Sequence, residues 1–141
     1  MATYNKVQDY AEQLNKAVHN WSSNTFKAAL TNTAPTGTTT AYGSITEISA
    51  GNGYSAGGMT LDTVTLTEAS GTAKVTIADE VLTASGGSIG PFRYVYIYND
   101  TATSPADAGV CYYDYGSSIT LASGETFTLD FDATNGLWQL V

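Results

Sequence analysis

Tyrosine is the residue type in this sequence with the most potential for chemistry, because ten of the 141 residues are tyrosine. Six of them fall in two short runs, Tyr94, Tyr96, Tyr98 and Tyr112, Tyr113, Tyr115. A tyrosine ring combines a large apolar face with a hydroxyl, which suits either a protein interface or a sugar ring. Side chains alternate between the two faces of a strand, so half of these rings should be core. An outward tyrosine row is more typical of a protein interface than of a sugar site.

Other reactive residue types are sparse. His19 is the single histidine, so no catalytic triad or histidine metal cluster can be assembled, and we expect it in solvent near a helix end. Asp130 and Asp132 share one face of an expected strand, but Ca²⁺ prefers a shaped acidic loop that the sequence lacks. Cys111 lies in an apolar run, which indicates a small buried hydrophobe. We therefore predict a protein that is not an enzyme and that carries no metal or cofactor.

The charge balance limits the partners. Five Lys and Arg residues against 13 Asp and Glu give a net charge of −8 and a pI near 4.2. Neutralising the phosphates of DNA or RNA is disfavoured for such a chain, so we expect no direct nucleic-acid partner. No apolar run approaches the roughly 18 residues needed to span a bilayer, and no export signal is visible, so we expect no membrane partner and folding in a cytoplasm.

The chain length suits a single domain, residues 1–141, that can bury a core without disulfides. Its first part, residues 1–22, has a helical apolar stripe, which predicts a helix over about 4–20. The residues of the stripe are Val7, Tyr10, Ala11, Leu14, Ala17, Val18 and Trp21. This stripe should pack on its own domain, or else against another subunit as an arm.

Residues 24–50 then combine a strand at 25–31, a Pro- and Thr-rich break, and one or two helical turns within 42–49. A glycine-rich stretch at 51–59 separates this part from the strands that follow. Because it carries a central aromatic residue, we interpret it as an ordered corner rather than a flexible linker. Corners often carry recognition loops, so Asn52 and Tyr54 are candidates for partner contact, with Tyr54 as a plug for its own core as the alternative.

From residue 59 onward the apolar period switches to two. Short strands are expected in a hairpin at 61–68 and 73–78, in a central strand at 92–98 paired with 109–115, and near 127–131 and 137–141. In the central strand, Phe92 should share a face with Tyr94, Tyr96 and Tyr98. Some eight or nine strands joined by short turns predict an antiparallel β-sandwich of jelly-roll type, with the N-terminal helix laid across one end or edge.

Six segments in this order resemble those of small virion structural proteins of tailed double-stranded DNA bacteriophages. The segments are 26–35, 46–58, 82–90, 92–100, 113–121 and 124–131, for example Phe92-Arg-Tyr-Val-Tyr-Ile-Tyr-Asn-Asp100. The resemblance covers about residues 24–137. The single segments are weakly specific, and their succession carries the resemblance.

The resemblance implies a structural part of the particle made in a bacterial host cytoplasm, with no catalytic residues. Small size, a compact β-domain and an acidic surface favour a capsid decoration or cement protein outside the head that bridges major capsid protein subunits as a dimer or trimer. Alternatives are a tail, baseplate or fibre-associated protein, and a glycan-binding module for host attachment. The expected interface residues are Asn52, Tyr54, Tyr94, Tyr96, Tyr113 and Tyr115.

Overall fold

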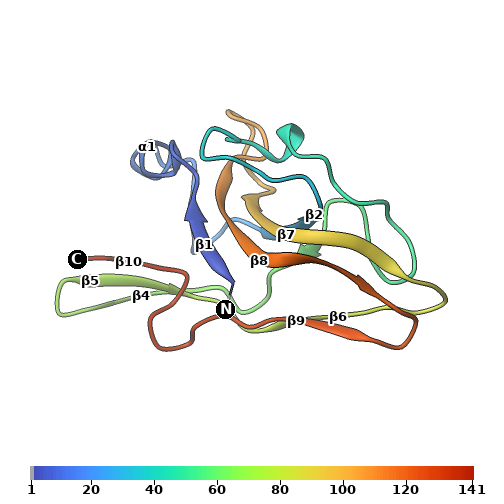
Figure 1. The fold of residues 1–141 in the computed structure, drawn as a ribbon. Coiled ribbons are helices and arrows are strands. Elements are labelled where there is room, and N and C mark those ends of the chain that lie inside the picture. The colour runs from blue at the N-terminus through green and yellow to red at the C-terminus, as the bar shows by residue number, and fades with distance from the viewer. Residues whose placement is uncertain (1) are drawn as a thin grey trace.

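A computed structural model describes residues 2–141 and shows a mainly β chain with antiparallel sheets (Figure 1). The largest sheet has five strands. In spatial order these are β1 (Thr3–Lys6), β8 (Gly109–Leu121), β7 (Ile89–Asn99), β2 (Phe26–Thr31) and β3 (Met59–Thr60). The prediction of an antiparallel, β-rich chain is confirmed.

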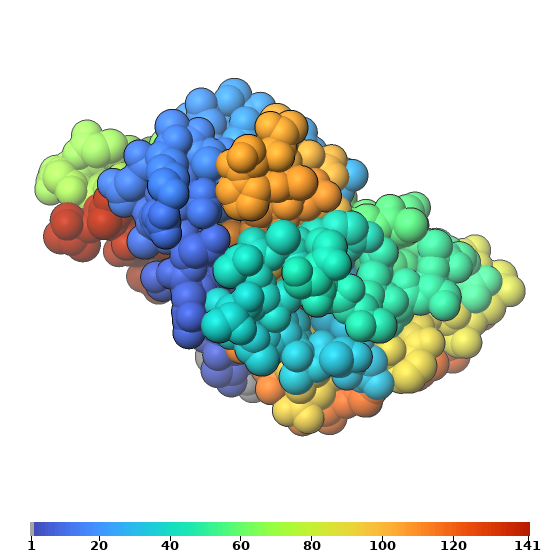
Figure 2. Space-filling view, turned by 90° about the horizontal axis from the view of Figure 1, so that it is seen from above, coloured from blue at the N-terminus to red at the C-terminus, as the bar shows by residue number. Residues whose placement is uncertain are grey.

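Two smaller sheets form a second layer below the five-stranded sheet (Figure 1). One contains β10 (Trp138–Leu140), β5 (Thr72–Thr76) and β4 (Thr65–Ala69). The other pairs β6 (Glu80–Thr83) with β9 (Thr126–Leu129). We call strands β4, β5 and β10 the arm, because they extend beyond the end of the five-stranded sheet in both Figure 1 and Figure 2.

Strand β7 is the centre of the core. It pairs with β2 on one side and with β8 on the other, so the predicted pairing of 92–98 with 109–115 is confirmed. Val95, Tyr96 and Ile97 are all buried, because this strand has a packed layer on each face. A strand covered on both faces has apolar residues without polar alternation, as this one does.

The two faces of β7 do not divide as the alternation predicts. Phe92 meets Phe127 of β9 with ring centroids 5.1 Å apart, on the side of the smaller sheets. The Tyr96 and Tyr98 hydroxyls instead donate hydrogen bonds to the 32–58 segment on the other side. The prediction that Phe92 shares their face is wrong, because the pairing register with β8 shifts between Phe92 and Tyr94.

Residues 32–58 cover the other face of the five-stranded sheet, and Figure 2 shows them from above in cyan and green. Tyr96 bonds to the Thr39 carbonyl at 2.7 Å, and Tyr98 bonds to the Gly57 carbonyl at 2.7 Å. Tyr42 stacks on Tyr98 with centroids 4.5 Å apart. Tyr42 begins η1 (Tyr42–Ser44), a single 3₁₀ turn where the sequence predicts one or two helical turns.

The N-terminal helix expected over 4–20 is wrong in both place and length. The chain begins with strand β1 on the edge of β8, and its only α-helix in the described residues is α1 (Tyr10–Asn15). Pairing with β8 satisfies the backbone of residues 3–6, and Ala17 at φ 60° ends the helical path. The stripe packs on its own domain in part: Val7, Tyr10 and Trp21 are buried, and Trp21 stacks on Phe26 at 3.7 Å, whereas Ala11 and Ala17 are exposed.

His19 lies in the core and not in solvent, which also corrects the sequence prediction. Its side chain is buried next to Asn99, whose amide nitrogen is 3.4 Å from His19 Nδ1. The same amide donates to the Val18 carbonyl and to Asn24 Oδ1. The buried Asn99 therefore fixes the irregular segment after α1 against the end of β7.

Candidate functional site

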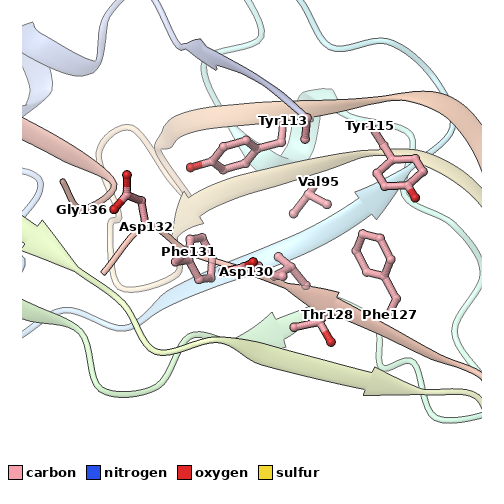
Figure 3. A pocket seen from close by; sticks show the side chains of 11 residues that line it. Val95, Tyr113, Tyr115, Phe127, Thr128, Asp130, Phe131, Asp132 and Gly136 are labelled. Atoms are coloured by element: carbon pink, nitrogen blue, oxygen red, sulfur yellow. The ribbon is translucent and has the colours of Figure 1, made fainter. Parts of the chain in front are cut away.

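A cleft of about 600 Å³ lies between the five-stranded sheet and strand β9 (Figure 3). Its residues come from the start of the chain, from β7 and β8, and from the stretch 127–136. They are Ala2, Val95, Tyr113, Tyr115, Phe127, Thr128, Leu129, Asp130, Phe131, Asp132 and Gly136. We refer to this space as the cleft.

The alternation of two strands builds the two walls of the cleft. Phe127, Leu129 and Phe131 point from β9 and its continuation toward the five-stranded sheet, as the sequence predicts. Tyr113 is the cross-strand partner of Val95, so both side chains lie on the same face of that sheet. The two walls are therefore mainly apolar.

The aromatic rings meet edge to face across the cleft. Tyr115 and Phe127 have ring centroids 5.9 Å apart, and Tyr113 and Phe131 are 6.5 Å apart. Such pairs contribute about 0.5–1.5 kcal/mol beyond the burial of their area. Tyr4 of β1 packs on the other side of Tyr113 at 5.5 Å. The ring of Tyr113 is held between two neighbours and has a defined position.

The hydroxyls of Tyr113 and Tyr115 lie at opposite ends of the cleft and point away from each other (Figure 3). Neither makes a hydrogen bond to another group of residues 2–141. Burial raises the pKa of Tyr113, so its hydroxyl stays protonated at neutral pH and can donate as well as accept. The cleft thus offers two unused hydroxyls beside apolar rings.

One end of the cleft is shaped by a turn that Asp132 organises. Its carboxylate accepts hydrogen bonds from the backbone N–H groups of Thr134 and Asn135 and from the Asn135 side chain, at 2.7–2.8 Å. These bonds hold the pKa of Asp132 below its usual range. The turn ends at Gly136, where φ is 76° and a side chain would collide with the Val75 carbonyl.

The charged side chains that line the cleft within residues 2–141 are both acidic, Asp130 and Asp132. Lys74 lies just outside the cleft, where its ammonium donates to the Thr134 carbonyl and its charge helps to lower the pKa of Asp132. Asp130 is exposed to solvent, whereas Asp132 is occupied by its turn. The arrangement can stack a ring and exchange hydrogen bonds. It disfavours an anionic ligand.

The glycine-rich corner is an ordered structure. Gly51 and Tyr54 exchange backbone hydrogen bonds of 2.8 and 3.0 Å around Asn52 and Gly53, which both have positive φ, as a tight Asn-Gly hairpin turn requires. Asn52 donates from its side chain to the Ser88 carbonyl at 2.8 Å. The corner at 51–54 is therefore tied to the second glycine-rich corner at 85–88.

Tyr54 is part of the core. Its side chain is 3% exposed, and its hydroxyl donates to Glu47 and accepts from the Leu30 backbone N–H. Glu47 also accepts from the Tyr42 hydroxyl at 2.6 Å and from the Gly57 N–H at 2.9 Å. Glu47 and Tyr54 together fix the 42–57 segment on β2.

The structure separates the residues that the sequence nominates for an interface. Tyr54, Tyr94 and Tyr96 are buried, and the Asn52 side chain is exposed but used within the fold. Only Tyr113 and Tyr115 lie together, in the cleft. The sequence indicates that 127–131 has an inward apolar face, but not that this face lies opposite Tyr113 and Tyr115. Contact between two layers of a fold leaves no signal in the local sequence.

The arm forms a second surface of interest. All five residues of β4 are exposed, and no strand of residues 2–141 pairs with its outer edge. Leu66, Val75 and Trp138 lie on one face of the arm because they are cross-strand partners. Val75 is buried, whereas Leu66 is 42% exposed and Leu140 is 60% exposed. The apolar face of the arm therefore continues beyond the core.

Within residues 2–141, no helix is long and apolar enough to cross a membrane, and no three His, Cys, Asp or Glu side chains are grouped as metal ligands would be. Comparisons of the chain with protein-family models, with characterised proteins and with solved structures find no match.

Proposed function

We propose that this chain is a structural, non-enzymatic component of a tailed-bacteriophage particle that binds outside the head and bridges major capsid protein subunits. The proposal begins from the resemblance of six segments to virion structural proteins of such phages. A decoration protein of this kind stabilises the particle by contact, and so it needs a rigid body and a surface for its partners.

The observation that carries the proposal is where these six segments lie. Three of them include β2, β7 and β8, which are neighbours in the five-stranded sheet. The glycine corners at 46–58 and 82–90 are joined by the Asn52–Ser88 hydrogen bond, and 124–131 packs on β7 through Phe127 and Phe92. Segments scattered along the sequence therefore form one contiguous body, as parts of a common scaffold would.

Most elements outside the six segments gather at one end of the molecule. They are strands β1, β4, β5 and β10 and helix α1, whereas η1 belongs to the 32–58 segment and β3 pairs with β2 at the other edge of the five-stranded sheet. Tyr10 and Trp138 lie 6.3 Å apart, and Trp21 and Trp138 lie 6.4 Å apart, so α1 and the arm share a cluster. We assign the contact with the neighbouring virion subunit to this end, with β4 as the central element.

The edge of β4 suits such a contact. A free edge presents unpaired N–H and C=O groups that another chain can pair with, and proteins usually protect such edges with Pro, Lys or bulges. Residues 65–69, Thr-Leu-Thr-Glu-Ala, contain no Pro or Lys, and their one charged residue, Glu68, accepts a hydrogen bond from the Gly71 N–H at 2.7 Å. A strand of a partner could extend the arm and cover Leu66 in the same step.

Cryo-electron microscopy of the intact particle tests the proposal. Density that fits the two-layer fold on the outer surface of the head, with the arm against a capsid subunit, is the expected result. Density confined to the tail, baseplate or fibres would reject the head position and favour the alternative of a tail, baseplate or fibre-associated protein. Absence of the chain from purified particles would reject a virion role altogether.

Two finer points belong to the same proposal. We propose a dimer or trimer on the particle, because decoration proteins commonly sit at capsid symmetry axes. We also keep the jelly-roll type as a proposal for the fold, although the second layer is divided into sheets of three and two strands. Sedimentation of the purified chain, alone and with capsids, measures the oligomeric state.

A further inference from the structure

We propose that the cleft between β8 and β9 is a binding site for a neutral carbohydrate. This inference is independent of the position of the chain on a particle. It rests on the shape of the cleft, on its two unused tyrosine hydroxyls and on the sign of its charge. A volume of about 600 Å³ lies within the range of small-molecule sites, roughly 300–1,000 Å³.

The pairing of polar and apolar groups points to an amphiphilic ring. Val95, Phe127 and Phe131 form apolar walls, while the hydroxyls of Tyr113 and Tyr115 lie at the two ends of the cleft (Figure 3). A purely apolar ligand would bury these hydroxyls without partners, which costs free energy. A sugar has apolar C–H faces and hydroxyls around its edge, so it can contact the rings and bond the tyrosines together.

The charges select a neutral ligand. An anionic ligand would meet Asp130 and Asp132, which are the charged lining residues of the cleft within residues 2–141. A cationic ligand would gain little, because Asp132 already accepts three hydrogen bonds from its own turn and Asp130 faces solvent, where salt screens its charge.

The walls of the cleft are also already in place. Tyr113 is packed between Tyr4 and Phe131, and the turn at 132–136 is closed by four hydrogen bonds within itself, including that from Gly136 N to the Asp132 carbonyl at 2.7 Å. A site that needs no ordering on binding loses less free energy to immobilisation. Tyr115, which is 48% exposed, is the solvent-facing member at the mouth.

The test is a titration of the full, ¹⁵N-labelled chain with methyl α-glucoside, methyl β-galactoside and N-acetylglucosamine, followed by amide chemical shifts. We expect saturable shifts with at least one of these sugars, confined to Val95, Tyr113, Tyr115 and the stretch 127–136, with a dissociation constant of about 1–10 mM for a single sugar ring. Absence of saturable shifts with all three at roughly 50 mM would overturn the proposal.

Variants separate this site from unspecific effects. Tyr115→Ala removes an exposed ring and should weaken binding at least about tenfold. Tyr115→Phe keeps the ring and should weaken it less. The matched control is Leu66→Ala, an exposed apolar residue on the arm, which should leave the affinity unchanged. Equal affinity in Tyr115→Ala and the original chain would reject the site.

The charge argument has its own test. Ethylammonium and acetate, each titrated alone at the same concentrations, should shift the cleft amides much less than the best sugar does. Saturable binding of ethylammonium that exceeds sugar binding would overturn the assignment to a neutral ligand.

Discussion

The Tyr54 hydroxyl donates a 2.7 Å hydrogen bond to Glu47 Oε1 and accepts one of 2.8 Å from the Leu30 backbone N–H. One buried oxygen thereby joins the glycine corner, the 42–57 segment and β2. Burial, and next to it the Glu47 carboxylate, raise the pKa of Tyr54, so the hydroxyl is protonated and donates at neutral pH. This bond turns a stretch with the composition of a linker into a fixed part of the core.

Tyr54→Phe should therefore destabilise the protein without changing its surface. The substitution keeps the ring but leaves the buried Leu30 N–H without its acceptor, at a cost of about 1–3 kcal/mol in the free energy of unfolding. Urea denaturation measures the loss. Tyr115→Phe, whose hydroxyl has no partner in the fold, is the control and should unfold like the original chain. Equal stability of the two variants would contradict the role given to the Tyr54 hydroxyl.

The buried His19 predicts a defined response to pH. Burial lowers its pKa to about 4, whereas an unfolded histidine titrates near 6.5. Below about pH 6.5 the unfolded chain binds a proton that the folded chain refuses, so the free energy of unfolding falls between about pH 6.5 and 4. The nearby Asp9 carboxylate opposes this shift. The full loss from His19 is at most roughly 3 kcal/mol.

The comparison that isolates His19 uses His19→Gln, which is uncharged at every pH. Carboxylates also titrate in this range, so the measured quantity is the difference between the two chains in urea denaturation at pH 7.0, 5.5 and 4.5. We expect the variant to be less stable at pH 7 but to lose less stability on acidification. Parallel curves for both chains would show that His19 does not carry the response.

Gly58 should tolerate no side chain. Its φ is 85°, and a Cβ atom there would collide with the backbone of Ala28 on β2. Gly58→Ala should cost more than about 1 kcal/mol in stability, since both the conformation and the contact are incompatible. Gly43 has open space around its Cα, so Gly43→Ala is the matched control and should cost far less. Thermal denaturation followed by circular dichroism distinguishes the two.

Leu66→Lys should weaken attachment to the particle but leave the isolated fold intact. The side chain lies on the exposed part of the apolar face of the arm, so a lysine there protects the β4 edge without opening the core. Binding to purified capsids that lack this chain should fall by at least about tenfold. Val81→Lys, an exposed apolar residue on β6, is the control. Unchanged binding of Leu66→Lys would remove the arm from the proposed contact.

Local pattern predicted the centre of the molecule and failed at its edges. The pairing of 92–98 with 109–115 and the inward face of 127–131 follow from the pattern, although Phe92 lies on the other face of β7 from Tyr96 and Tyr98. The glycines with Tyr54 also indicate an ordered corner. The apolar stripe at the N-terminus predicts one long helix, but a short strand, a short helix and an irregular segment that wrap around one core can also bury every third or fourth residue. Trp21 and Val7 are buried as a helix would bury them, but the free edge of β8 recruits residues 3–6 as a strand.

The cleft was harder to predict than the fold. The pattern of their own strand indicates Tyr113 and Tyr115, but the opposite wall of the cleft is formed by 127–132, on and after a strand of another sheet. Tyr94 and Tyr96 carry the same local signal and are core, because the 32–58 segment covers their face. The strand register and the packing of the layers, and not the local sequence, distinguish tyrosines of the cleft from tyrosines of the core.

The tie between the two glycine-rich corners bears on proteolysis and on engineering. Their composition suggests the first places that a protease would cut. However, the Asn52 side chain donates to the Ser88 carbonyl and the Ser85 N–H donates to the Asn52 carbonyl, so these bonds oppose the unfolding of either corner into the active site of a protease. The turn at Ser70 and Gly71 has open space around it and joins two exposed strands of the arm. Nicking, and tolerance of an inserted peptide tag, should therefore concentrate at that turn, far from the richest run of glycine.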